Sequence, residues 1–337
     1  MSPDRFQSIT GQYSNLRLAV VGDFCLDRYL EIDPSKQEIS IETNLPVHNV
    51  VRVRPQPGGA GTILNNLSAL GVGTIYAIGF AGEDGEGFEL SRELNRRQGV
   101  RLDHFVRSTG RRTFTYCKPL LVAPNKPPVE LNRLDSKNWT ETPADVQGML
   151  IRGLEKVAAE VQGIIVLDQV GLPETGVVTR SVLEAVGQLA DRYPELLILA
   201  DSRRGLRGYP PVVFKMNASE LGALTSAQKE QSLDWVKEKA GALAHKNGRS
   251  VFVTLAGGGI VGATAAGEVQ HVLSLPLRGE IDIVGAGDAV SANLATAIAS
   301  GATLLEALEL ANAAASVVIH QLGTTGSATV GQIAEMF

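Results

Sequence analysis

Asp-Ile-Val-Gly-Ala-Gly-Asp, residues 282–288, runs directly into the alanine-rich stretch Ala-Val-Ser-Ala-Asn-Leu-Ala-Thr-Ala-Ile, residues 289–298. The two glycines allow a tight turn, and the small residues after them predict a helix. The first N–H groups of a helix have no internal partner and lie at the positive end of its dipole, so this loop predicts an anion site. Asp288 lies in the first turn, where a carboxylate can act as a base toward a hydroxyl that attacks a phosphoryl group. The alternative is an ordinary turn in which Asp288 only caps the helix.

A second glycine-rich stretch lies far upstream. Pro-Gly-Gly-Ala-Gly-Thr at residues 57–62 is followed by Ile63, Leu67 and Leu70 at helical spacing, which predicts an apolar helix that ends near Gly71. Residues 75–87 follow as a predicted strand that runs into a glycine-rich loop.

Short apolar runs alternate with helical stretches along most of the chain. The predicted strands cover residues 16–23, 163–168, 196–201 and 250–255, and the predicted helices include 180–191 and 233–245. This order indicates an α/β fold with a parallel sheet that is buried on both faces. Three of the strands end on aspartates, namely Asp23, Asp168 and Asp201. Ligands bind beyond the carboxyl ends of such strands, so each aspartate is either near a site or a cap for the next helix.

Two segments break this strand and helix alternation. Residues 25–53 alternate polar and apolar side chains, and residues 101–135 contain short apolar runs at 105–106, 113–117 and 120–122. Both segments predict short antiparallel strands.

Composition favours a small-molecule partner. The 337 residues suit one large α/β domain or two ordinary ones, and a net charge of −5 argues against nucleic acid or an anionic membrane as partner. Cys25 and Cys117 give neither a disulfide framework nor metal-ligand spacing. Without a signal-peptide pattern or a run of about 18 apolar residues, we expect a cytoplasmic protein.

The two glycine-rich stretches together resemble the two signatures of the PfkB, or ribokinase-like, carbohydrate kinases. The resemblance covers essentially the whole chain and implies a three-layer α/β/α fold with a mostly parallel central sheet. It also implies a single kinase domain over 1–337, with a small β-sheet lid from about 25–53 and 101–135. In this family the lid often forms a dimer contact, so the resemblance implies a homodimer.

The same resemblance implies an ATP- and Mg²⁺-dependent sugar kinase. Its catalytic base is Asp288, and its anion hole consists of the backbone amides of Gly285, Ala286 and Gly287. Residues that would contact the sugar are Asp27, Gly58, Gly59 and Thr62, the last where the family usually has an asparagine. Residues that would contact the nucleotide are Asn217, Thr254, Gly257, Gly259 and Asn312. Glu220 and Asn217 match the Asn-x-x-Glu motif that orders Mg²⁺, and a monovalent cation is a further candidate cofactor.

Within the family, Gly-Asp-Phe-Cys-Leu-Asp-Arg-Tyr at residues 22–29 resembles the heptose-7-phosphate kinase domain of bifunctional heptose kinase/adenylyltransferase proteins. That likeness implies a phosphorylated sugar, for which Arg28, Arg133 and Arg203 are the candidate phosphate ligands. Residues 169–171, Gln-Val-Gly, depart from this branch, which has a Tyr and a Lys there. A catalytically silent sugar- or nucleotide-binding regulator on the same fold therefore stays open, suggested by Thr62, Met216 and Ile283. A dinucleotide-binding oxidoreductase is disfavoured because no Gly-x-Gly-x-x-Gly follows the first strand.

Overall fold

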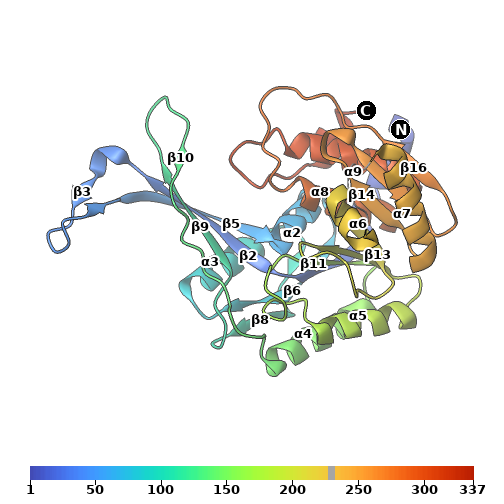
Figure 1. The fold of residues 1–337 in the computed structure, drawn as a ribbon, viewed down its shortest axis with the longest axis horizontal. Coiled ribbons are helices and arrows are strands. Elements are labelled where there is room, and N and C mark those ends of the chain that lie inside the picture. Colours follow the sequence, from blue (N-terminus) through green and yellow to red (C-terminus); the bar gives the residue numbers. More distant parts are fainter. Residues whose placement is uncertain (227–231) are drawn as a thin grey trace.

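A computed structural model describes residues 1–226 and 232–337 (Figure 1). Its main sheet has the strand order β16-β15-β14-β13-β12-β11-β1-β6-β7, with β8 also paired to β6. All neighbours from β14 to β7 are parallel, whereas β15 and β16 are antiparallel additions at one edge. The strands are β1 (Arg17–Gly22), β6 (Thr74–Gly82), β7 (Val100–Arg101), β8 (Phe105–Ser108), β11 (Gly163–Asp168), β12 (Leu197–Ser202), β13 (Val213–Asn217), β14 (Val251–Thr254), β15 (Ile260–Ala263) and β16 (Val269–Val272).

Both faces of this sheet are buried, as the continuous apolar strands predict. In β1, Leu18 and Val20 point into one hydrophobic core while Ala19 and Val21 point into the other. The first core is shared with α2 (Ala60–Ala69), α8 (Ala286–Ala299) and α9 (Leu304–Val318), and the second with α4 (Ala144–Ala158), α5 (Arg180–Arg192) and α7 (Leu233–Asn247). Figure 1 shows α4 and α5 on one side of the sheet and α8 and α9 on the other, and the two buried cores confirm the predicted three-layer α/β/α fold.

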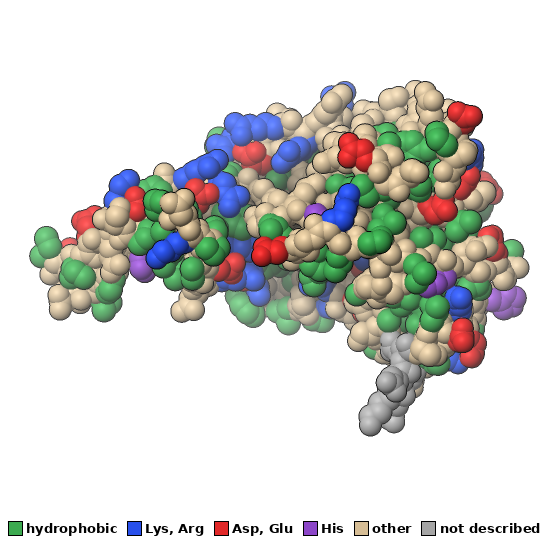
Figure 2. Space-filling model, turned by 90° about the horizontal axis from the view of Figure 1, so that it is seen from above, with side chains coloured by type: hydrophobic (Ala, Val, Ile, Leu, Met, Phe, Trp, Pro, Cys, Tyr) green, Lys and Arg blue, Asp and Glu red, His purple; other side chains and the backbone are tan. Residues whose placement is uncertain are grey.

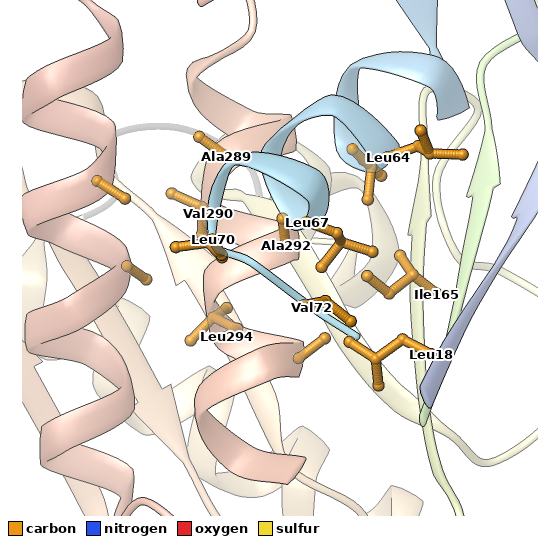
Figure 3. Close-up of a cluster of buried hydrophobic side chains, with 14 of the residues drawn as sticks. Leu18, Leu64, Leu67, Leu70, Val72, Ile165, Ala289, Val290, Ala292 and Leu294 are labelled. Atoms are coloured by element: carbon orange, nitrogen blue, oxygen red, sulfur yellow. The ribbon is translucent and has the colours of Figure 1, made fainter. Parts of the chain in front are cut away.

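Packing between α2 and α8 determines where the two glycine-rich stretches lie relative to each other. Leu67 of α2 and Leu294 of α8 belong to one cluster with Leu18 and Ile165 of the central strands (Figure 3). Leu18, Leu67, Ile165 and Leu294 are all fully buried, and burial of one such side chain stabilises the fold by about 1.5–3 kcal/mol. The N-termini of α2 and α8 are close to each other, since a Cβ atom built at Gly285 would lie 3.6 Å from Thr62 Cγ2.

A smaller, separate sheet has the strand order β10-β9-β2-β5. Its strands are β2 (Phe24–Ile32), β5 (Val50–Gly59), β9 (Thr115–Leu121) and β10 (Val129–Glu130), and a two-stranded hairpin of β3 (Glu38–Ile39) and β4 (Pro46–Val47) projects away from the body (Figure 1). The β2–β5 and β9–β10 pairs are antiparallel as predicted, but β2 and β9 are parallel. We call the β10-β9-β2-β5 sheet the small sheet.

Two expectations for local structure are wrong. Residues 105–106, predicted as an antiparallel strand outside the parallel sheet, lie in β8, which pairs in parallel with β6. The apolar run could not reveal this, because pairing with β6 depends on the position of the chain after α3 (Gly85–Asn95). The predicted glycine-rich loop after the strand is also shorter than expected, because α3 begins at Gly85, where Asp84 caps the helix by accepting from Gly87 N.

Shorter helices complete the structure. These are α1 (Pro3–Thr10), α6 (Ala218–Thr225) and α10 (Val330–Ala334), of which α1 and α10 are in contact. Within the described residues, no helix combines the length and the apolar character needed to cross a membrane.

Candidate active site

The two glycine-rich stretches meet at Gly285. This residue is the N-cap of α8 and has φ 85°, a conformation that favours glycine. A Cβ atom built at residue 285 would lie 3.6 Å from Thr62 Cγ2 and 3.5 Å from Thr325 Cα. The loop that would form the anion hole is thus packed between α2 and the segment after α9.

Asp288 lies one turn into α8, at the open end of the helix. Burial raises the pKa of its carboxyl to about 7, and the negative charge of Asp201 raises it further, while Lys215 and Arg203 oppose the shift. A carboxyl that titrates near neutral pH is suited to take a proton from a hydroxyl. No hydrogen bond from the described residues reaches this carboxylate to make it a helix cap.

A buried ion pair lies directly beside the anion-hole loop. Lys215 Nζ is 2.7 Å from Asp201 Oδ2, which also accepts a hydrogen bond of 3.2 Å from Ser291 Oγ of α8. A Cβ atom built at Gly287 would lie 3.0 Å from Lys215 Nζ. Burial lowers the pKa of Lys215, but attraction to Asp201 outweighs this, so the pKa is raised and the lysine stays charged.

Sequence reasoning missed Lys215. The signal was available, because Lys215 is the single charged residue in the apolar strand β13 and is almost fully buried. A charged side chain in that position requires a buried partner.

The small sheet presents Asp27 next to the two glycines of β5. Asp27 pairs in register with Gln56 of β5 and Tyr116 of β9, and a Cβ atom built at Gly58 would lie 2.5 Å from Asp27 Oδ2. Gly59 has φ 57°, and a Cβ atom there would lie 2.4 Å from the carbonyl oxygen of Asp23. Both positions therefore favour glycine, and the carboxylate of Asp27 lies directly against Gly58.

Cations gather on the face of the small sheet that carries Asp27. Lys118 Nζ lies 3.1 Å from Asp27 Oδ1 and 4.8 Å from the ring centre of Tyr29, and Arg54 lies over the same ring at 4.7 Å. Arg133 lies over the ring of Tyr116 at 5.0 Å. Figure 2 shows Lys and Arg side chains, drawn in blue, along this part of the molecule.

The three arginines that the sequence offered as phosphate ligands lie in different parts of the structure. Arg133 lies on the Asp27 face, although it is partly exposed and pairs with Asp135. Arg28 follows Asp27 in the strand and points to the opposite face, where it pairs with Glu89 of α3. Arg203 lies outside the small sheet, directly after β12.

Of the three aspartates at strand ends, only Asp201 pairs with Lys215 beside the N-terminus of α8. Asp23 is fully buried, and its carboxylate accepts the backbone N–H groups of residues 169, 170 and 177, which fixes the loop after β11. Asp168 accepts hydrogen bonds from Ser202, Arg204 and Tyr209 beside a separate cavity of about 550 Å³. None of the three caps the helix that follows it.

A cavity of about 1070 Å³ lies on the other side of the α8 N-terminus. All five residues expected to contact a nucleotide line it, together with two residues of the anion-hole loop: Asn217, Thr254, Gly257, Gly259, Asn312, Ala286 and Gly287. Its remaining wall is largely apolar and includes Leu273, Leu277 and Val290. Apolar walls with a few polar groups suit a flat heterocyclic base.

Asn217 and Glu220 form a reciprocal capping box at the start of α6. Asn217 Oδ1 accepts from Glu220 N, and Glu220 Oε2 accepts from Asn217 N. Among the described residues, no cluster of three His, Cys, Asp or Glu side chains could hold a metal ion. Mg²⁺ usually keeps several waters and binds through one or two carboxylates plus substrate phosphates. Oε1 of Glu220 fits such an ion, whose other ligands would be waters and nucleotide phosphates.

A mostly parallel α/β sheet covered by helices on both faces, with a separate small sheet, defines a ribokinase-like fold. Solved structures agree on that fold. Arabidopsis thaliana ribokinase complexed with ribose and ATP has a TM-score of 0.68 and 20% identity, covering 95% of this chain and 98% of that chain. Escherichia coli phosphofructokinase-2 in complex with fructose-6-phosphate has a TM-score of 0.66 and 18% identity, covering 95% and 97%.

Residues 16–330 match the pfkB family carbohydrate kinase model, and the chain belongs to that family. Among curated proteins, the bifunctional protein HldE of Gluconacetobacter diazotrophicus is 29% identical over 327 residues, which is 96% of this chain and 64% of that protein. HldE of Azorhizobium caulinodans is 31% identical over 310 residues, or 91% and 61%. The chain thus spans somewhat less than two thirds of the length of these relatives.

Proposed function

We propose that this protein is an ATP-dependent sugar kinase in which Asp288 is the base. The observation that carries the proposal is the location of Asp288. It lies in the first turn of α8, and the pKa of its carboxyl is raised to about 7. That helix end lies between the nucleotide-sized cavity and the Asp27 face of the small sheet. A base, oriented backbone dipoles and two flanking binding regions are what transfer of a phosphoryl group to a hydroxyl requires.

In the proposed reaction, Asp288 takes the proton of a sugar hydroxyl while the hydroxyl oxygen attacks the γ-phosphorus of ATP. The bond from that phosphorus to the bridging oxygen breaks, and ADP leaves with the electron pair. The amides of Gly285, Ala286 and Gly287 stabilise the charge on the transferring group, and the charge of Lys215 lies beside them. Glu220 and Asn217 would hold Mg²⁺ through water, and the ion would neutralise charge on the nucleotide phosphates. A monovalent cation remains a further candidate cofactor.

We also propose that the sugar carries an anionic group, with a heptose phosphate as the first candidate. Lys118 and Arg54 flank Tyr29 on the face that carries Asp27, and Arg133 lies nearby over Tyr116. Such a group of cations would hold a phosphate distant from the reacting hydroxyl. The likeness to HldE agrees with this substrate class. Asp27 would accept hydrogen bonds from sugar hydroxyls, with Gly58, Gly59 and Thr62 shaping the pocket.

The small sheet would act as the lid of a single kinase domain and as the contact between two copies of the chain. Large apolar side chains are exposed on its β5 strand and on the projecting hairpin, including Ile39, Leu45, Val51 and Val53. Exposed apolar side chains of this kind mark interaction surfaces. Lid closure would exclude water from the phosphoryl group.

An assay of ATP consumption against a panel of sugars, sugar phosphates and nucleosides tests the proposal. We expect turnover with at least one phosphorylated sugar and much weaker turnover with its free counterpart. Turnover of neutral sugars alone would contradict the anionic substrate and leave the kinase assignment standing. Tight binding of ATP and a sugar without turnover would contradict the kinase assignment and favour the silent regulator.

A further inference from the structure

Arg203 has no role in the reaction proposed above. It follows β12 directly, and its backbone N–H donates to the carbonyl oxygen of Asp168 at 2.9 Å. Its Nε donates to Oε1 of Gln169 at 3.2 Å, while the rest of the side chain is exposed. Within residues 1–226 and 232–337, the guanidinium is thus hydrogen-bonded at one nitrogen only, and its other N–H groups point to no protein acceptor there.

Gln169 connects this arginine to the sugar end of the cleft. Its backbone N–H donates to Asp23 Oδ2 at 2.9 Å, which anchors the loop. A Cβ atom built at Gly59 would lie 3.4 Å from Gln169 Cγ, so the glutamine side chain lies against the second glycine of the Gly-Gly pair. Arg203 is therefore hydrogen-bonded to a residue that contacts Gly59, where the acceptor sugar would lie.

The positive charge of Arg203 also reaches the phosphoryl-transfer side. Arg203 follows Asp201 by two residues, and the partner of Asp201 is Lys215 Nζ, which lies beside the anion-hole loop at Gly287. After burial and the nearby charges of Asp201 and Lys215, the charge of Arg203 lowers the pKa of Asp288. Arg203 is thus linked through Gln169 to Gly59, and it lies two residues from Asp201, whose partner Lys215 borders the anion-hole loop. In the proposed reaction, the γ-phosphoryl group would pass between these two regions as it moves from ADP to the sugar.

We propose that Arg203 is a catalytic residue that binds the transferring phosphoryl group and that Gln169 is its positioning residue. This inference rests on the proposed kinase function. Arg203 would donate hydrogen bonds to non-bridging oxygens of the γ-phosphoryl group, and it would neither gain nor lose a proton. Asp288 would take the hydroxyl proton and ADP would leave, as described above. The planar, always charged guanidinium matches phosphate oxygens in two-point geometry.

This assignment differs from a role in holding the substrate's own phosphate. The cations suited to that role, Lys118, Arg54 and Arg133, lie on or over the small sheet, whereas Arg203 directly follows β12 of the main sheet. A substrate-phosphate ligand would change the Michaelis constant for the sugar. A ligand of the transferring group would change kcat.

Arg203→Ala tests the inference, with Arg207→Ala as a matched control. Arg207 lies on the same loop but donates to the carbonyl oxygens of Ala223 and Leu224 at the end of α6. We expect Arg203→Ala to lower kcat by a factor on the order of 10² to 10³, with ADP affinity unchanged within about twofold. Added guanidinium ion should restore part of the lost kcat. Gln169→Ala should lower kcat by about tenfold without guanidinium rescue, and Arg207→Ala should match the wild type.

Three results would overturn the inference. These are a normal kcat in Arg203→Ala, a loss confined to the Michaelis constant of a phosphorylated sugar, and a lost kcat that guanidinium does not restore while ADP binding and folding are intact. In each case wild-type turnover shows that the kinase proposal itself stands. A wild-type protein that turns over no sugar would overturn both.

Discussion

Lys215 Nζ lies 2.7 Å from Asp201 Oδ2, and this buried ion pair touches the anion-hole loop at Gly287. The two residues come from neighbouring strands, β13 and β12. Ser291 of α8 donates to the same carboxylate, so one hydrogen-bond network joins the sheet to the helix whose N-terminus would bind phosphate. The network holds a positive charge at a fixed place beside the anion hole.

Removal of the lysine should therefore harm both stability and turnover. Lys215→Met leaves Asp201 buried without its counter-ion, and we expect unfolding free energy to fall by about 3–5 kcal/mol. The double variant Lys215→Met, Asp201→Asn should recover most of that loss while turnover stays low. Urea denaturation measures the first effect and steady-state kinetics the second. Equal stability of the wild type and Lys215→Met would show that the pair is not buried as described.

Asp288→Asn should keep the fold and nucleotide binding but lower turnover by roughly two or more orders of magnitude, because an amide cannot take the hydroxyl proton. In the wild type, kcat/KM should rise with pH until about pH 7, where the carboxyl loses its proton. Kinetics from pH 5 to 9 measure the profile. Near-normal turnover of the variant, or a profile that is flat through pH 7, would remove Asp288 from the mechanism.

The same carboxyl should make stability depend on pH. Its pKa is about 7 in the folded protein against 3.8 for an unperturbed aspartate, so the native state binds more protons than the unfolded state between these values. This contribution to stability is fully present below about pH 4 and is lost as pH rises to about 7. Because the side chain is partly exposed, we expect the wild type to lose about 2 kcal/mol relative to Asp288→Asn over this range. Denaturation of both proteins at pH 4.5 and 7.5 measures the difference, and a constant gap would contradict the raised pKa.

Gly59→Ala should destabilise the protein more than Gly71→Ala does. Both glycines have positive φ, 57° and 77°. A Cβ atom at residue 59 would lie 2.4 Å from Asp23 O, whereas nothing lies within 4 Å at residue 71. Gly71→Ala should cost about 1 kcal/mol from backbone strain alone, and Gly59→Ala about 2–4 kcal/mol because the backbone must also shift. Equal losses of unfolding free energy would show that the close approach to Asp23 does not matter.

Sugar and metal contacts should separate by substitution. Glu220→Gln should raise the Mg²⁺ concentration needed for half-maximal turnover, because a neutral amide holds a hydrated ion less strongly. Asp27→Ala should weaken sugar affinity, with little change in the affinity for ATP. Titrations of Mg²⁺, ATP and sugar in each variant measure these effects. The same change in all three ligands for both variants would contradict this division of the site.

The sequence by itself was sufficient for the layered fold and for the helix that begins within the glycine-rich loop at 285–287. Continuous apolar strands such as 163–168 can be buried only in a sheet covered on both faces, and the glycines before α8 predict an open helix end, because both are local properties of the chain. The spacing of the two glycine-rich stretches also carried the family resemblance, which the match over residues 16–330 confirms.

Only the tertiary structure decided which charged side chains share the site. Arg28 and Asp27 are neighbours in sequence, yet strand alternation sends Arg28 to the opposite face, toward Glu89. Asp168 and Asp201 end adjacent strands alike, but the first is bonded to Arg204 and Tyr209 and only the second reaches Lys215. Charge pairing depends on distances between segments that are remote in the chain. Local pattern and propensity contain no information about those distances, which arise only when β2, β12, β13 and α8 are packed together.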